Sequence, residues 1–435
     1  MSTISLAMIV KNEEKFLGRC LESVKKLVDE IALVDTGSTD NTIEIAKSFG
    51  AKIYTFAWTD DFAEARNHSL SVCSCDWILI LDADETIDPL DLPVIKNAYA
   101  EQTVDAYRMV HRHYLPDGHQ TLADMPPKKN RSKYTEGRQY EHYSDHPVIR
   151  LARRFDGLRF DNKVHETLDS SLKRHGKRIA DLDAVIHHYG KLQMGREAAK
   201  EDYYLKLALE QVKVQSQDKW SHFNVLQQAL GAKKYDIAIQ AAQAAIDLGL
   251  ELPFVRWGLG AALQETDRHS EAIEQFDIIL KDDPKHIAAM TKKAISVAVM
   301  GDLEAARGMF QRAMEINPEY SPTYCHLATV ETAMGLLAQA RKTVTRGLSV
   351  SPNEPQLHDA LIKVGVAAQD HPQAAMDSLA AIVACPKGGE GRWHLYLASF
   401  LAEGGEKQRA KAVLREGLAA FPENEELKTM DRELA

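Results

Sequence analysis

The sequence predicts an α/β domain with a mostly parallel sheet and helices on both faces, followed by an all-α solenoid of helical repeats. In residues 1–85, short apolar runs alternate with stretches of helical periodicity. Near-continuous apolar strands separated by helices are typical of a parallel sheet that is buried on both faces. In the second half, prolines and small residues recur every 34 residues, which indicates a two-helix repeat.

The elements of the α/β region follow one another in a regular order. The expected strands are "TISLAMIV", "EIALVD", "AKIYTF" and "DWILILD", and the expected helices between them are "EEKFLGRCLESVKKL", "NTIEIAKSFG" and "DDFAEARNHSLSVC". In sheets of this kind, ligands bind beyond the carboxyl ends of the strands, where the strand order switches. Asp35 and Asp82 both stand at such ends, so we expect a binding site there.

Several positions of the second half keep the same interval. The repeating residues are Pro284, Pro318, Pro352 and Pro386, with Ala238, Ala272, Ala306, Ala340 and Ala374, and with Phe276 and Phe310. Small residues where paired helices touch and a proline after the second helix form the tetratricopeptide pattern. The last unit is two residues longer, with Ala374 and Ala410 36 residues apart, and the extra residues fit the turn "PKGGEG". Stacked repeats of this kind leave a concave surface that typically holds peptide or protein segments.

The segment between the two regions shows little periodicity. Residues 116–147 are charged and irregular, which is typical of a functional or disordered loop. A helix is expected from Gly195 to Gln215. We therefore predict an α/β domain over 1–194, a helical connector over 195–220 and the repeat domain over 221–435.

Composition and charge exclude several classes of protein. The net charge is −10 and the pI is near 6.0, which argues against a general nucleic-acid binder because such proteins usually carry a basic surplus. The apolar start "ISLAMIV" is too short for a signal peptide, and no apolar run is long enough for a membrane span. The five cysteines are scattered and fit no disulfide framework. We expect a cytoplasmic protein.

Four motifs resemble a known family. In chain order, "SLAMIVKNEEKFLGRCLESV", "IALVDTGSTDNT", "DFAEARNHSL" and "WILILDADE" resemble the nucleotide-sugar domain of family-2 glycosyltransferases with the GT-A fold. The segments "RFDNKVHETL" and "VIHHYG" resemble bacterial members with C-terminal tetratricopeptide repeats, of the sublancin-type peptide S-glycosyltransferases. The resemblance implies an inverting transferase that uses a nucleotide-diphosphate sugar, with uridine favoured as the nucleoside, and a divalent metal.

The acidic end of the fourth predicted strand suits this chemistry. Along an extended strand, residues i and i+2 face the same way, about 7 Å apart, so Asp82 and Asp84 are expected to point into one cleft. Asp82 would hold a ribose hydroxyl, and Asp84 would ligate Mg²⁺ or Mn²⁺, which prefer oxygen ligands. The alternative is a solvated strand end, but the ordered set of motifs disfavours it.

Three further residues are candidates for nucleotide-sugar binding. Asp35 stands where family members contact the base of the nucleotide, although an Asp before "TGS" also favours a turn. Arg66 stands where the family places a contact to the nucleotide, and its guanidinium matches phosphate geometry. Glu14 follows the first strand and is either a ligand contact or a first-turn helix residue that the helix dipole favours.

The catalytic base is predicted from the segment "VHE". Inverting transfer needs a group that takes the proton from the acceptor, and Glu166 is the best counterpart of the family's acidic segment beyond the D-x-D motif. The alternative is a structural ion pair of Glu166 with Arg159 or Lys163. His165, His187 and His188 are candidates for a third metal ligand, because neutral imidazole is a good ligand.

The repeats point to a polypeptide acceptor. We expect a Ser, Thr or Cys side chain of a peptide or protein, held partly on the repeat surface, while a homodimer through the repeats is the alternative use of that surface. Two other functions stay open. One is transfer to a glycan or lipid-linked intermediate, and the other is a non-catalytic repeat scaffold with a decayed transferase domain.

Overall fold

The computed structural model describes residues 2–101, 103–115, 127–131, 133–190, 197–386 and 388–434. The described chain divides into two compact units, one with residues 1–116 and 127–262 and the other with the repeats from residue 263 onward. Much of the irregular segment 116–147 and the start of the expected connector lie outside the described residues. The first unit therefore extends to residue 262, beyond the predicted start of the repeats at 221.

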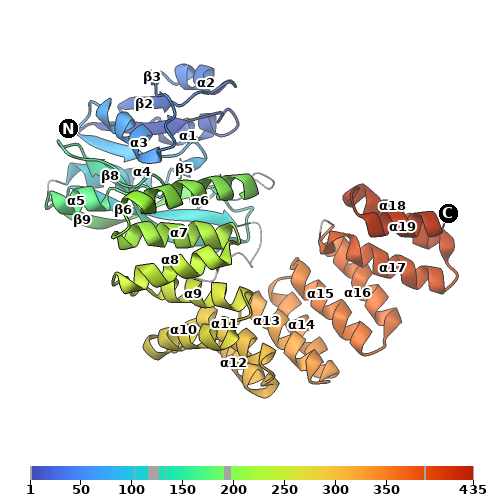
Figure 1. Ribbon diagram of the computed structural model, residues 1–435. Helices are drawn as coiled ribbons and strands as arrows, with labels where there is room; N and C mark the ends of the chain where they lie inside the picture. Colours follow the sequence, from blue (N-terminus) through green and yellow to red (C-terminus); the bar gives the residue numbers. More distant parts are fainter. Residues whose placement is uncertain are drawn as a thin grey trace. The chain divides into compact units, whose positions relative to one another are not determined.

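The first unit is built around one mixed sheet (Figure 1). Its strand order is β3-β2-β1-β4-β8-β6-β9-β5, with β7 paired to β8. The strands are β1 (Ile4–Val10), β2 (Glu30–Asp35), β3 (Lys52–Thr55), β4 (Trp77–Ile80), β5 (Glu85–Ile87), β6 (Ala106–Leu115), β7 (Lys128–Lys129), β8 (His142–Arg153) and β9 (Ile179–His188). The first four strands are parallel, as predicted, and β8 pairs antiparallel with both β4 and β6.

Apolar side chains cover both faces of the parallel strands. In β1, Ile4, Leu6 and Met8 belong to one core and Ala7 belongs to the other. The first core includes Leu17 and Leu21 of helix α1 (Leu17–Val24), and the second includes Leu70 of helix α3 (Phe62–Ser71). Because successive strand residues point to opposite faces, only a nearly continuous apolar run fills both cores. This confirms the α/β interpretation of the sequence.

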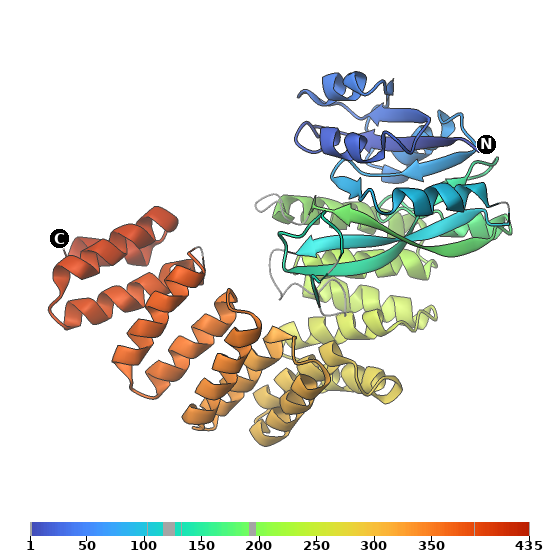
Figure 2. The same cartoon turned by 180° about the vertical axis from the view of Figure 1, so that it is seen from behind.

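Nine helices of the described chain begin before the unit boundary, and the last of them crosses it. They are α1 (Leu17–Val24), α2 (Thr42–Ser48), α3 (Phe62–Ser71), α4 (Leu92–Ala100), α5 (Asp169–Arg174), α6 (Glu197–Val214), α7 (Lys219–Gly231), α8 (Tyr235–Asp247) and α9 (Pro253–Glu265). Figure 2 shows the long strands β6 and β8 from behind, in cyan to green.

The second unit is a run of paired helices, as the 34-residue period predicted. Its described helices are α10 (His269–Asp282), α11 (Ile287–Val299), α12 (Leu303–Ile316), α13 (Ser321–Ala333), α14 (Leu337–Val350), α15 (Pro355–Ala367), α16 (His371–Ala384), α17 (Arg392–Glu403), α18 (Lys407–Ala420) and α19 (Glu425–Glu433), with a short 3₁₀ turn η2 (Gly389–Gly391). The repeated alanines are fully buried: Ala272, Ala306, Ala340, Ala374 and Ala410. Within the described residues, no helix is long and apolar enough to cross a membrane.

A buried carboxylate joins three strands at the amino end of the sheet. Glu30, at the start of β2, accepts hydrogen bonds from Ser5 of β1, from Lys52 Nζ of β3 at 2.7 Å and from the backbone N–H of Ser74 at 2.8 Å. Burial alone would raise the pKa of Glu30, but the bonds from Lys52, Ser5 and Ser74 outweigh it and lower the pKa to about 2.

We predict that Glu30→Gln destabilises the first unit in a pH-dependent way. The folded-state pKa of about 2 lies below the ordinary value of 4.5, so the ionised group stabilises the fold above pH 4.5, and this is lost as the pH falls towards 2. Urea unfolding at pH 7 should show a loss on the order of 2 kcal/mol that shrinks below pH 4. Glu44→Gln, on an exposed residue, is the control, and an equal loss at both pH values would contradict the assignment.

Candidate active site

A cleft of about 790 Å³ opens at the carboxyl ends of β1 and β4. Its walls come from the first unit alone, and they carry several of the residues predicted from the sequence. Its lining residues include Glu13, Trp58, Phe62, Arg66, Asp82, Asp84, Arg150, Val164, His165, Glu166, His188, Tyr203, Tyr204 and Gln228. Arg66, Asp82, Asp84, His165 and Glu166, which are far apart in the sequence, thus share one cavity.

The acidic residues lie on a turn between β4 and β5. The backbone N–H of Asp82 donates to Glu85 Oε2 at 2.9 Å, and the N–H of Glu85 donates to the Asp82 carbonyl at 3.1 Å. The expectation of an extended strand through Asp84 was therefore wrong, because these reciprocal bonds close the chain into a turn. The side chains of Asp82 and Asp84 still both line the cleft, with 31% and 22% of their surfaces exposed.

Two buried guanidinium groups hold the carboxylates together. Arg66 Nη2 donates to Asp82 Oδ1 at 2.7 Å and Arg66 Nε donates to Glu166. Arg150, on β8, donates to Asp82 Oδ2 at 3.2 Å and to Glu85 Oε1 at 2.9 Å. Burial alone would raise the pKa of Asp82, but Arg66 and then Arg150 outweigh it and hold the pKa well below its usual range. Burial would likewise lower the pKa of Arg66, yet its pKa is raised by Asp82 and Glu166.

The loop after Phe160 places Glu166 in the cleft. Its ion-pair partner is Arg66, whereas Arg159 pairs with Asp161 at 3.5 Å, so the pairing of Glu166 expected with Arg159 or Lys163 is not the one observed. The Glu166 side chain is 14% exposed, enough to face a ligand in the cleft. Its role as a base remains a prediction.

The three candidate histidines occupy different environments. His188 lies at the acidic turn, with Nε2 3.4 Å from Asp84 Oδ2. Burial alone would lower the pKa of His188, but the bond and charge of Asp84 outweigh it and raise the pKa. His187, the next residue of the strand, points to the other face, where Nδ1 lies 2.7 Å from the hydroxyl of Tyr114. His165 is exposed and contacts Gln228.

Asp35 and Glu14 are held by local backbone rather than by the residues of the cleft. The Asp35 carboxylate accepts the backbone N–H groups of Gly37 at 3.2 Å and Ser38 at 3.0 Å, which stabilises the turn after β2. Glu14 accepts from the backbone and side chain of Asn41 at the start of α2. The cleft is lined by the neighbouring Glu13 instead.

Aromatic side chains form one wall of the cleft, and two of them come from α6. Tyr203 donates to Asp60 Oδ1 at 2.5 Å, and Trp58 Nε1 donates to the same oxygen at 2.8 Å. The rings of Phe62 and Tyr204 meet edge to face at 5.7 Å. The sequence predicted this helix as a connector only. The adjacent "YY" in the helix was the available signal, but the sequence could not show which surface it met.

Comparison with known proteins matches two parts of the chain to known families. Residues 5–156 match the family described as "Glycosyl transferase family 2", and residues 300–363 match the tetratricopeptide repeat. The first unit therefore contains a family 2 glycosyltransferase domain. Tetratricopeptide repeats follow it in the chain, as the sequence predicted.

Three curated proteins are similar to parts of the chain. A TPR repeat-containing protein of Synechococcus elongatus is 34% identical over 44% of this chain and 43% of its own length. The lipopolysaccharide core biosynthesis glycosyltransferase LpsC of Rhizobium meliloti is 28% identical over 48% of this chain and 71% of its own. The SPbeta prophage-derived glycosyltransferase SunS of Bacillus subtilis is 39% identical over 19% of this chain and 20% of its own. The chain thus spans less than half the length of two of these relatives, and the short match to SunS supports the family of the domain but no shared acceptor.

The residues of the glycosyltransferase domain fit a divalent cation. Four carboxylates, Asp82, Asp84, Glu85 and Glu166, face two guanidinium groups, Arg66 and Arg150. Asp82, Glu85 and Glu166 are each bonded to a guanidinium, whereas Asp84 has only the imidazole of His188 within ion-pair distance among the described residues. Oxygen donors with unbalanced negative charge suit Mg²⁺ or Mn²⁺, and Asp84 is the residue best placed to ligate one.

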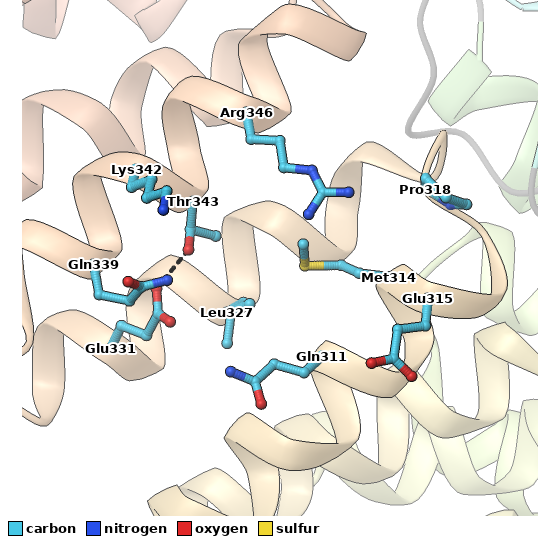
Figure 3. A pocket seen from close by; sticks show the side chains of 10 residues that line it. All are labelled: Gln311, Met314, Glu315, Pro318, Leu327, Glu331, Gln339, Lys342, Thr343 and Arg346. Carbon is cyan, nitrogen blue, oxygen red and sulfur yellow. Dashed lines mark hydrogen bonds between the residues drawn. The ribbon is translucent and has the colours of Figure 1, made fainter.

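A separate groove of about 550 Å³ lies in the repeat unit between α12, α13 and α14 (Figure 3). Leu327 and Glu331 of α13 are buried residues among its lining, and Glu331 accepts a hydrogen bond from Thr343 at 2.7 Å. Lys342 and Arg346 of α14 bring two cationic groups to it. The groove combines apolar and amide groups with charges of both signs, because Glu315 and Glu331 line it beside the two cationic groups.

We predict that Arg66→Met destabilises the glycosyltransferase domain by about 3 kcal/mol, because Asp82 and Glu166 would lose the buried guanidinium that neutralises them. Urea unfolding at pH 7 measures the loss. Arg66→Lys should cost less, since an ammonium keeps the charge but not the fork that reaches both carboxylates. Arg159→Met removes an arginine that is 61% exposed and serves as the control, with a loss under about 0.5 kcal/mol. Equal losses for the two methionine variants would refute the bridging role.

Proposed function

We propose that the protein is an inverting glycosyltransferase that moves a sugar from a UDP-linked donor to a Ser, Thr or Cys side chain of a polypeptide. The observation that carries this proposal is the acidic turn in the cleft of a family 2 domain, where Asp84 remains without a guanidinium partner. An intact network of charges at this point also disfavours a decayed, non-catalytic scaffold, because a site without function has no reason to keep buried ionic groups that cost desolvation energy.

Each of the chain's residues has a distinct task in this proposal. A divalent cation held by Asp84 would stabilise the negative charge of the departing diphosphate when bound. Asp82 would accept a hydrogen bond from the ribose, and Arg66 would keep Asp82 and Glu166 in place. Asp35 retains free lone pairs beside its turn bonds, so it can accept a base N–H. Glu14 lies with α2 and is assigned no direct contact.

Glu166 would act as the base. The acceptor oxygen or sulfur forms its bond to the anomeric carbon from the face opposite the diphosphate, whose bond to that carbon breaks. The acceptor proton passes to Glu166 Oε2, the oxygen that is not bonded to Arg66. The proton leaves the thiol or hydroxyl as the new bond forms.

We expect Asp84→Asn and Glu166→Gln to separate donor binding from transfer. Asp84→Asn should abolish both Mn²⁺-dependent hydrolysis of UDP-sugars and the thermal shift that UDP-sugar with Mn²⁺ produces in the wild type. Glu166→Gln should keep the thermal shift and lose transfer by at least about 100-fold. Asp76→Asn, a residue distant from the cleft at the start of β4, is the control. Full hydrolysis by Asp84→Asn would overturn the proposal.

The polypeptide acceptor is supported by the groove between α12 and α14. An alternative acceptor is a glycan, which the name of LpsC as a lipopolysaccharide core biosynthesis glycosyltransferase suggests, because the chain covers 71% of that relative. The repeats favour the polypeptide, since stacked helical repeats commonly bind peptide segments. A panel of Ser-, Thr- and Cys-containing peptides and of lipopolysaccharide core oligosaccharides, each with radiolabelled UDP-sugar, distinguishes the two.

For a peptide that is glycosylated, we predict that the double variant Lys342→Glu, Arg346→Glu raises KM for the peptide by about tenfold or more, with kcat and donor hydrolysis unchanged, because the loss of two attractive charges weakens ground-state and transition-state binding alike. Arg409→Glu, on an exposed arginine of α18, is the matched control. An unchanged KM would show that the acceptor binds elsewhere.

A further inference from the structure

Three histidine rings gather beside the acidic turn, on strands β6 and β9. His111 and His113 are two residues apart on β6 and so point to the same face. His188 pairs in register with His113 across the parallel β6–β9 ladder. One ligand atom from each ring lies within 4.8 Å of the other two. The ring centroids are 4.3 Å apart for His111–His113 and 4.6 Å for His113–His188.

We propose that His111, His113 and His188 bind a borderline first-row divalent cation of the Zn²⁺ class, at a site separate from the hard cation of Asp84. This goes beyond the proposed transfer reaction, because such an ion would bind with or without a nucleotide sugar. Imidazole nitrogen suits Zn²⁺, Co²⁺ and Ni²⁺, whereas carboxylate and diphosphate oxygens suit Mg²⁺ and Mn²⁺. The two sets of ligands therefore select different ions.

The contacts around the rings provide an independent observation in favour of a site. Asp84 Oδ2 lies 3.4 Å from Nε2 of His188, and Glu85 Oε1 lies 2.7 Å from Nε2 of His111. A carboxylate on one ring nitrogen fixes the ring and makes the other nitrogen a better ligand, which is the usual outer arrangement around metal-binding histidines. His188, with Nε2 turned to Asp84, offers Nδ1 to an ion, whereas Nε2 of His111, although near Glu85, is buried without a hydrogen bond among the described residues.

The Nδ1 atoms of His113 and His188 already face one another at 2.8 Å. Two imidazoles this close cannot both be protonated at these atoms, so at least one presents a lone pair there. An ion at this point would replace the shared proton and hold all three rings.

The consequence is a link between this ion and the acidic turn. His188 contacts Asp84 and His111 contacts Glu85. A cation that fixes the two rings would therefore also fix both carboxylates of the turn. The histidine site thus acts as a positioning element for the cleft and takes no part in bond breaking.

Metal binding by the full chain tests the inference without any donor or acceptor. After treatment with a chelator, the wild-type protein should bind one equivalent of Co²⁺, measured by the visible absorption of the ion and by elemental analysis after gel filtration. Zn²⁺ should displace it and raise the melting temperature. His113→Ala and His188→Ala should each weaken Co²⁺ binding by more than about 100-fold, because a ligand is lost rather than its outer partner.

Two further variants make the result decisive. Asp84→Asn should keep the stoichiometry of Co²⁺ and weaken binding only about 10–100-fold. His222→Ala, on a ring of α7 that contacts the Ser216 carbonyl, should bind as the wild type. His113→Asn replaces the alanine variant if the latter unfolds, with circular dichroism as the check. If Asp84→Asn loses Co²⁺ while His113→Ala or His113→Asn retains it, the ion lies at the turn and the proposal is overturned. The proposal is also overturned if the wild type does not bind Co²⁺. Neither result depends on whether the protein transfers sugar.

Discussion

The candidate site depends on two buried guanidinium groups that share one carboxylate. Asp82 accepts from both Arg66 and Arg150, while each arginine also reaches a second acid, Glu166 or Glu85. Burying these charges costs several kcal/mol per ion, and only bonds of good geometry recover that cost. The network is therefore intolerant of displacement. It fixes the turn after β4 relative to the loop that carries Glu166, two segments that are separated by about eighty residues of chain.

The order of the strands explains why these side chains meet. Across the sheet the order runs β4, β8, β6, β9, and neighbouring strands contribute, in turn, Asp82 just after β4, Arg150, His111 and His188. At the end of this order, β5 pairs antiparallel with β9, and Glu85 lies in register with His188. Because β8 and β5 run antiparallel to their neighbours, strands of both directions bring residues to the same edge of the sheet. A wholly parallel sheet would bring only carboxyl ends there.

The sequence was informative where a pattern repeats or where a motif is local. The 34-residue period located the helix pairs, and the apolar runs located β1 to β4. The sharing of one cleft by Arg66, Asp82, Asp84 and Glu166 also agreed with expectation. The sequence did not indicate Arg150, because its contacts depend on the antiparallel register of β8, which no local pattern reveals. His187 and His188 show the same limit, since adjacent strand residues point to opposite faces and only the sheet decides which one meets Asp84.

Helices α6 and α7 have a larger part in the site than a connector would need. Gln211 of α6 accepts the backbone N–H of Lys163 at 2.9 Å, and Asn224 of α7 donates to the Val164 carbonyl at 3.3 Å. These bonds hold the loop in which His165 adopts a positive φ of 53°, a conformation that is costly for a residue with a side chain. The strain is thus supported by the helices, and the loop presents Glu166 to the cleft.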